Sequence, residues 1–470
     1  MEKTLAEKLA EFVVNLKFTD LPDDVIRTTK LSTLDDLGVM IAASEEPCVK
    51  IALDYARTIG GSPDSTVFVH GDKLPVTSAA FVNGIACHSL ELDDHISHKR
   101  SLNHPGVVTV PPAMALGECM GVTGKEYLLA TVLGYDITCR INNAVTPGFF
   151  NFERGFHGTA ITGTFGAAAL TGKMLGMTAD EIATAFGICG SMTAGSSEFK
   201  ATGAWTKRLH AGNASRNGII AANLAKRGFT GPHTVLEGRS GFYNSYAGAG
   251  NYNLDNVIKD LGTDFEVRYI QYKPYSSSGV MHSPMTAAKK LVEKYSLKPE
   301  DIQHMKVFTS AKMVKEYCEP REQKTNPKNS VDAQFSLIYA IAALLCKGKY
   351  LIEEYSEEAL KDQRTLDLCQ KIECVADPVL DAQWPQKEHS KVIVTTYDGR
   401  ELVQEVEAAK GSLEDPMSEA EIIDKFRSLT KPFLTEDTTE KLIALCMNLE
   451  KEDTIRVLAE TVQGGLRNRT

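Results

Sequence analysis

The sequence lacks the cysteine spacing that binds metals. Its ten cysteines include no Cys-x-x-Cys pair, and the two closest, Cys369 and Cys374, are five positions apart. Structural zinc sites and iron–sulfur clusters need closely spaced thiolates, so this spacing argues against both. Most of the cysteines lie among apolar residues, as at Cys87 and Cys346. We expect them to be small buried hydrophobic residues in a reducing compartment.

The sequence also lacks a long apolar run, a signal-like N-terminus and an excess of positive charge. No segment approaches the roughly 18 apolar residues of a membrane span. Residues 1–10 alternate charged with apolar side chains, unlike a signal peptide, so we expect a cytoplasmic protein. The net charge of -10 argues against nucleic-acid or anionic-membrane partners. An anionic substrate would therefore need a local group of cations.

The chain of 470 residues is long enough for two or three domains. Residues 1–264 show helical spacing with short breaks and are rich in Ala, Gly, Leu and Met, which lets helices pack closely. Beyond Asp264, strand-like segments near 265–272, 305–310, 371–375, 391–397 and 402–406 alternate with helical ones. We predict a mostly α protein: a large all-helical domain over 1–264, completed by C-terminal helices in 409–470, and a smaller α+β lid domain over 265–408.

Histidines are concentrated in one short segment. His88, His95, His98 and His104 fall within 17 residues, and Glu91, Asp93 and Asp94 lie among them. An acid/base site would use such titratable groups at different pKa values. A metal site is the first alternative, since Glu91 and His95 are four residues apart. The second is a solvated loop in which one Asp caps the next helix. No companion ligand cluster exists elsewhere, so we favour acid/base chemistry without a metal.

Two further segments carry cations beside predicted helix starts. Lys207, Arg208 and His210 lie in a Gly-flanked segment placed just before a helix, and such a group suits an anion. The alternative is a surface loop with ordinary basic residues. Lys273 ends a predicted strand and leads through hydroxyl residues, Ser278 among them, to His282 at the next helix. This junction again suits a carboxylate. His157 stands alone at a helix start, where a structural role is the more common one.

Taken in order, these segments resemble the MmgE/PrpD family over nearly the whole chain. The family includes dehydratases of 2-methylcitrate, decarboxylases of cis-aconitate and epimerases of iminodisuccinate. The matching motifs are Asn83-Gly84, His88, Leu92-Asp93-Asp94, His104-Pro105-Gly106, Phe156-His157-Gly158-Thr159, residues 206–212, 227–232 and 236–238, Lys273-Pro274-Tyr275 and residues 333–339.

The resemblance implies an MmgE/PrpD-like fold, a homodimer and a cofactor-free site in the cleft between the domains. It places the catalytic histidines at His104 and His157, the lysines at Lys207 and Lys273, and the tyrosine at Tyr339. Six further residues are expected to contact substrate together with Ser278: Glu91, Asp93, His95, Arg208, His210 and His282.

The chain also departs from its relatives. Mammalian-type decarboxylases carry Asp where Glu91 stands, Thr where His95 stands and a pocket His where Ser278 stands, and the methylcitrate dehydratases carry Arg at Gly279. We expect a lyase that acts on a small di- or tricarboxylate, with dehydration or hydration of a 3-hydroxy polycarboxylate as the leading reaction. Epimerisation of a dicarboxylate and decarboxylation remain alternatives, and Ser278 disfavours decarboxylation. A binding module without catalysis would not need two imidazoles among the cations.

Overall fold

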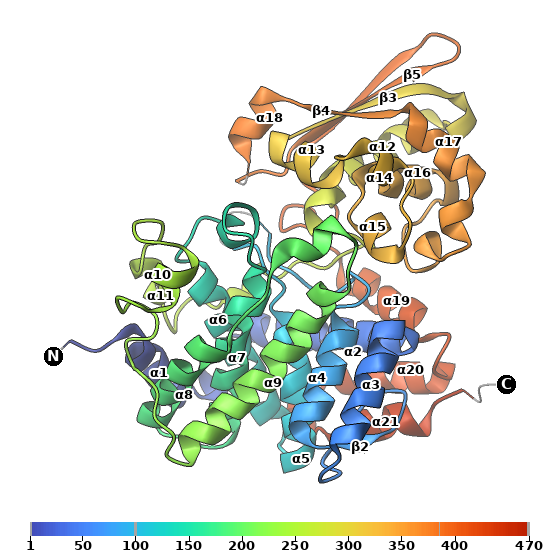
Figure 1. Ribbon diagram of the computed structural model, residues 1–470. Coiled ribbons are helices and arrows are strands. Elements are labelled where there is room, and N and C mark those ends of the chain that lie inside the picture. Colours follow the sequence, from blue (N-terminus) through green and yellow to red (C-terminus); the bar gives the residue numbers. More distant parts are fainter. Residues whose placement is uncertain (1, 98–100, 385, 468–470) are drawn as a thin grey trace.

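The computed structural model describes residues 2–97, 101–384 and 386–467, so His98 lies outside the described residues. Two bodies, each with its own hydrophobic core, are stacked one on the other (Figure 1). The larger core draws on residues from Leu5 to Tyr272 and again from Ile422 to Val462. The smaller core draws mainly on residues from Tyr275 to Val406. The predicted fold class, a large helical domain with a smaller α+β domain, is confirmed.

The larger body is a packed set of helices around α7 and α9 (Figure 1). Its helices up to residue 258 are α1 (Leu5–Asn15), α2 (Asp23–Ala42), α3 (Pro47–Ile59), α4 (Val76–Cys87), α5 (Val110–Met120), α6 (Gly124–Asn142), α7 (Gly158–Met174), α8 (Ala179–Met192), α9 (Thr206–Lys226), α10 (Phe242–Tyr246) and α11 (Asp255–Ile258). Small residues set the helix spacing. A Cβ at Gly84 of α4 would lie 3.0 Å from Cα of Gly212 in α9.

The C-terminal helices return to the larger body, where α19 (Glu419–Thr430) and α20 (Glu436–Met447) pack on α2. Figure 1 shows them and α21 (Arg456–Gly464) beside α2 and α3. Phe426 of α19 fills the space above Gly38, and Lys425 forms an ion pair with the buried Asp35 at 2.8 Å. These contacts connect residues almost 400 positions apart in the sequence.

The smaller body has a four-stranded sheet of order β4-β3-β5-β6, in which β3 pairs parallel with β4 and antiparallel with β5. The strands are β3 (Ile302–Thr309), β4 (Ile372–Ala376), β5 (Ser390–Thr396) and β6 (Glu401–Val406). Burial alternates along β5, so one face packs and the other meets solvent. The helices are α12 (His282–Tyr295), α13 (Ala311–Tyr317), α14 (Arg321–Thr325), α15 (Ser330–Gln334), α16 (Leu337–Lys347), α17 (Gln363–Lys371) and α18 (Pro378–Gln383), and Figure 1 shows α12 and α16 below the sheet.

Two local predictions are wrong. The segment 265–272 is not a strand of the sheet: Glu266–Tyr269 forms a 3-10 helix, and only Gln271 pairs, with His95. Its apolar residues are buried against the helical body, so alternation there reflects burial and not sheet pairing. Helix α9 begins at Thr206, earlier than predicted, and its first turns carry the cations of residues 207–210. The other strand-like segments beyond residue 300 are strands.

Within the described part of the chain, no helix is both long enough and apolar enough to cross a membrane.

Candidate active site

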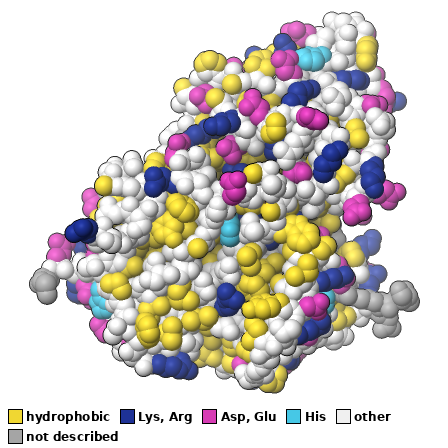
Figure 2. Space-filling view, viewed as in Figure 1, with side chains coloured by type: hydrophobic (Ala, Val, Ile, Leu, Met, Phe, Trp, Pro, Cys, Tyr) yellow, Lys and Arg dark blue, Asp and Glu magenta, His cyan; other side chains and the backbone are white. Residues whose placement is uncertain are grey.

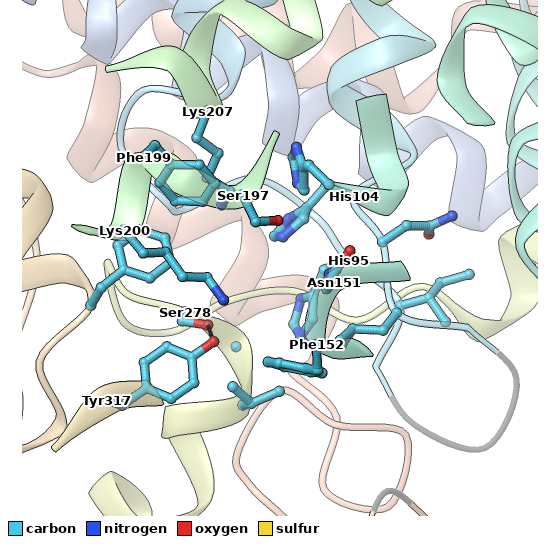
Figure 3. A pocket seen from close by; sticks show the side chains of 17 residues that line it. His95, His104, Asn151, Phe152, Ser197, Phe199, Lys200, Lys207, Ser278 and Tyr317 are labelled. Atoms are coloured by element: carbon cyan, nitrogen blue, oxygen red, sulfur yellow. Dashed lines mark hydrogen bonds between the residues drawn. The ribbon is translucent and has the colours of Figure 1, made fainter. Parts of the chain in front are cut away.

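A small cavity of about 50 Å³ lies where the two bodies meet. One side comes from the helical body and the other from the smaller body, and Figure 3 shows His104 facing Ser278 and Tyr317 across it. Five of the predicted site residues line this pocket: His95, His104, His157, Lys207 and Ser278. Two of them, His95 and His104, come from the residues that follow α4.

The imidazole of His104 is hydrogen-bonded to the carboxylate of Asp93. Nδ1 of His104 lies 2.7 Å from one oxygen of the Asp93 carboxylate, which is fully buried. Lys273, His88 and His104 hold the pKa of Asp93 well below its usual range although burial opposes this, so Asp93 is a carboxylate and Nδ1–H must donate. Asp93 itself does not line the pocket, and its predicted contact with substrate stays a prediction. Asp93 orients His104.

His104 is uncharged at neutral pH. Burial, with Lys273 as the next cause, lowers the pKa of its imidazole to about 3, and Asp93 only partly opposes the shift. Because Nδ1 carries the proton, Nε2 has a free lone pair on the ring edge away from Asp93. The side chain is 16% exposed, and the residue lines the pocket. This neutral, oriented imidazole has a lone pair that can accept a proton from a bound molecule, and the lowered pKa makes it a weaker base than a free imidazole.

Two more imidazoles lie beside His104. His157, at the start of α7, lines the pocket, and its Nδ1 is 3.2 Å from Nδ1 of His210 in α9. His88 stacks on His157 at 5.4 Å and lies 3.3 Å from Asp93. Burial lowers the pKa of His88 and His157, so both are neutral at physiological pH. His210 does not line the pocket and contacts His157, so its predicted binding of substrate stays a prediction.

His88, His104 and His157 form the one group that could hold a metal ion among the described residues. Their ligand atoms all lie within 4.8 Å of one another. Two nitrogens bound to one zinc ion at about 2.1 Å cannot be more than about 4.2 Å apart. At the longest of these separations a ring would have to move before all three could bind one ion. Metal independence therefore stays a prediction.

Glu91 joins the two predicted lysines. Lys207 donates to one of its carboxylate oxygens, and Lys273 lies 3.3 Å from the other. Burial would raise the pKa of Glu91, but Lys207 and Lys273 together hold it below its ordinary value. Glu91 has a φ of +51°, a strained conformation for a residue other than glycine. Neither Glu91 nor Lys273 lines the pocket, so of the two lysines only Lys207 faces it.

The pocket holds a second cation and a tyrosine that the sequence did not indicate. Lys200, in the 3-10 helix Ser197–Ala201, lines the pocket and forms an ion pair with Glu316 of α13 at 2.8 Å. Tyr317 ends α13, and its hydroxyl accepts a hydrogen bond from Ser278 at 3.0 Å. Burial raises the pKa of Tyr317, so it keeps its proton. Nothing near Lys200 or Tyr317 in the sequence marks them as site residues.

His95 and Ser278 line the same pocket. His95 is almost fully buried, and its pKa lies well below the usual value, through burial first and then Lys273. His282 packs behind His95, with ring centroids 6.2 Å apart, and does not reach the pocket. The ring of His282 supports that of His95, and its predicted contact with substrate stays a prediction.

The two remaining predicted residues serve structural contacts. Arg208 binds Glu46 at 3.0 Å and lies 3.4 Å from Gln334 of α15, so it connects the two bodies and does not line the pocket. Tyr339 lies in the core of the smaller body, where its hydroxyl donates to the carbonyl oxygens of Glu354 and Ala359. In this arrangement its hydroxyl is bonded away from the pocket, and its predicted catalytic role stays a prediction. Tyr317 is the tyrosine that the pocket contains.

Comparison with known proteins covers almost the whole chain. The chain is 28% identical to human cis-aconitate decarboxylase, covering 99% of this chain and 95% of that protein. It is 26% identical to cis-aconitate decarboxylase of Aspergillus terreus, over 97% of this chain and 95% of that protein. Identity to 2-methylcitrate dehydratase of Salmonella typhimurium is 24%, over 81% of this chain and 79% of that protein. Residues 7–255 match the MmgE/PrpD N-terminal domain and residues 275–451 the MmgE/PrpD C-terminal domain, so the chain belongs to the MmgE/PrpD family.

Proposed function

We propose that this protein is a lyase that acts on a small tricarboxylate by acid/base catalysis without a cofactor. The observation that carries the proposal is the neutral imidazole of His104, oriented by Asp93 and placed in the same pocket as Lys207. The relatives support the substrate class, because they are named for cis-aconitate and 2-methylcitrate.

His104 is the base in this proposal. Nε2 of His104 removes a proton from the carbon next to a substrate carboxylate, and negative charge develops on that carboxylate. Lys207 and Lys200 are the pocket cations that stabilise the charge, and their effect is large where water is scarce. Tyr317, which keeps its proton, protonates the group that leaves. The substrate must compete with Glu91 for Lys207, since Glu91 now neutralises that lysine.

Loss of water is the reaction we propose first. Beside its cations the pocket has neutral polar groups, His95, Ser278 and Tyr317, which suit a hydroxyl leaving group better than a carboxylate. Decarboxylation is the second candidate, favoured by the identity to the cis-aconitate decarboxylases over the full chain. Epimerisation of a dicarboxylate would use the same base and return the proton to the other face.

The smaller body acts as the lid in this proposal. Of the predicted range 265–408, residues 265–272 pack in the helical core, so we take residues 275–406, which form the smaller core, as the lid. Contacts between the bodies at the pocket connect Lys200 to Glu316, Lys312 to Glu153 and Arg208 to Gln334. The volume of the pocket is only about 50 Å³, so binding of a tricarboxylate requires the two bodies to separate. Closure then excludes water and orients the substrate against His104.

A panel of acids followed by NMR tests the proposal. The purified protein is incubated in deuterium oxide with 3-hydroxy tricarboxylates, cis-aconitate and a set of dicarboxylates. A dehydratase loses the signal of the hydroxyl-bearing carbon and forms an alkene. A decarboxylase releases carbon dioxide, and an epimerase exchanges a proton while the connectivity is retained. Unchanged NMR spectra for every acid in the panel would contradict the lyase proposal.

We also propose a homodimer, with the face formed by α3 and α9 as its interface. Figure 2 shows hydrophobic side chains gathered over the helical body, whereas charged ones predominate on the smaller body. Helices α3 and α9 flank α4 and expose large apolar residues: Ile51 is 61% and Tyr55 56% exposed, and Trp205 and Leu209 are also exposed. Light scattering should give twice the chain mass for the wild type and the monomer mass for Ile51→Arg/Tyr55→Glu. A dimer that survives both substitutions would place the interface elsewhere.

A further inference from the structure

Gly279 leaves a space that His95 fills. Gly279 begins a 3-10 helix, Gly279–Met281, in the smaller body. Gly279 and His95 both line the pocket. A Cβ at position 279 would lie 2.6 Å from Nε2 and 2.8 Å from Cδ2 of His95, closer than side-chain carbons pack. The φ of Gly279 is outside the left-handed region, so the backbone does not require glycine. Position 279 is thus kept free of a side chain by the ring of His95 alone.

The backbone that carries the ring of His95 is held in place by two hydrogen bonds. Its backbone N–H donates to Gln271 at 3.0 Å, and the N–H of Gln271 donates back at 2.8 Å. The rings of His104 and His282 lie 6.1 and 6.2 Å from it on two sides. A methyl group at position 279 would therefore turn the ring about its side-chain torsions and move it out of its place in the pocket, without a change in the backbone.

The group that His95 brings to the pocket is neutral and short of partners. Nδ1 is buried and has no hydrogen-bond partner among the described residues, an arrangement that calls for a ligand or a water. Burial and Lys273 keep the ring uncharged. The neighbouring Ser278 and Tyr317 are hydroxyl groups that bind each other. An uncharged imidazole beside two hydroxyls pairs with an alcohol as donor or acceptor, whereas Lys200 and Lys207 provide the charge that carboxylates require.

We infer that Gly279 is a specificity-determining residue: by leaving room for His95, it creates a neutral polar subsite that binds the hydroxyl group of a hydroxy tricarboxylate. This inference rests on the proposed function and adds the substrate class to it. The subsite separates hydroxy acids from their analogues without the hydroxyl, because a site that forms a hydrogen bond with a substrate hydroxyl loses that bond with the analogue.

Citrate and tricarballylate carry the same three carboxylates and differ by one hydroxyl, so their affinities measure the subsite directly. Calorimetry on the wild type should show citrate bound about tenfold more tightly, the value of one net hydrogen bond of about 1.4 kcal/mol. In Gly279→Ala and in His95→Ala this ratio should fall to within about twofold, with tricarballylate affinity nearly unchanged. The double variant should match the single ones. Gly464→Ala, where a Cβ meets nothing within 4 Å, is the matched control and keeps the wild-type ratio.

The possible outcomes distinguish a failure of this inference from a failure of the proposed function. If the wild type binds both acids equally, or if both variants keep the preference for citrate, the inference is wrong while tricarboxylate binding still supports the proposed function. If the wild type binds neither acid at millimolar concentration, the proposed function and the inference fail together. His95→Ala adds no atoms to the pocket, so it still carries the test if Gly279→Ala does not fold.

Discussion

Nδ1 of His104 lies 2.7 Å from the Asp93 carboxylate, while Nζ of Lys273 lies 3.5 Å from the same nitrogen. The shorter contact is a hydrogen bond donated by the imidazole, so Lys273 directs its protons to Glu91 and Asp93 instead. Asp93 thereby fixes the tautomer of His104 and leaves Nε2 unprotonated. The same carboxylate neutralises Lys273, so one buried acid serves both the base and a lysine of the site.

Replacement of Asp93 by Asn should lower kcat by about three to four orders of magnitude and change KM only a few-fold. The amide cannot hold His104 in the tautomer that a base needs, and a comparable loss follows the same change in serine-protease triads. Steady-state kinetics on each acid that the wild type converts will measure this. A kcat within tenfold of the wild type would show that His104 does not depend on Asp93.

The pH profile of kcat/KM should show no loss of activity on the acid side near pH 6.5. The pKa of His104 is about 3 because of burial and Lys273, so the base stays unprotonated down to pH values at which the substrate itself takes up protons. Activity should therefore be lost only well below pH 6. On the alkaline side the limb should lie below 10.5, because burial lowers the pKa of Lys207. An acid limb at 6.5 would mean that an exposed, ordinary histidine is the base.

Lys207→Met should abolish turnover and also destabilise the protein. Loss of this cation leaves Glu91 buried with Lys273 as its remaining partner, and breaking a buried ion pair costs about 3 kcal/mol or more. The double variant Lys207→Met/Glu91→Gln is the matched control, since it removes one charge of each sign. Its melting temperature should recover toward that of the wild type, whereas kcat/KM should stay at least about a hundredfold reduced. Recovery of activity in the double variant would contradict the role of Lys207.

Asp94 makes the stability of the fold depend on pH. Burial first, then Asp35 and Asp93, raise its pKa to about 7, although Tyr135 donates a hydrogen bond to it at 2.5 Å. Because the pKa of Asp94 is higher in the folded than in the unfolded state, its contribution to the stability of the fold is complete below pH 4. That contribution is lost as the pH rises to 7. The melting temperature of the wild type relative to Asp94→Asn should fall across this interval and level off above it. A constant difference from pH 4 to pH 8 would show that Asp94 stays ionised.

Much of the fold follows from patterns along the chain, because helical spacing and strand alternation are local. The cluster around His104, the cation at Lys207 and the polar pair His95 and Ser278 could be predicted, since chemistry-bearing residues are concentrated in a few segments. Lys200 and Tyr317 could not, because the pocket joins them across the two bodies and their neighbours in sequence are unremarkable in composition.

Burial and pairing place several predicted residues away from the pocket. The hydroxyl of Tyr339 bonds two backbone carbonyls in the core. Lys273 and Arg208 suggested free cations in the sequence, and both have carboxylate partners in the fold. A sequence shows which groups exist but not which of them neutralise one another. That distinction decides which cations remain to bind a substrate.

Solvent-deuterium incorporation is the measurement that tests the central claim most directly. The claim is that Nε2 of His104 removes a proton from the carbon beside a substrate carboxylate. With an acid that the wild type converts, NMR in deuterium oxide should show deuterium at that carbon, and His104→Asn should show none while it still binds the acid. Exchange at the wild-type rate in His104→Asn would contradict the claim and assign the proton transfer to another group.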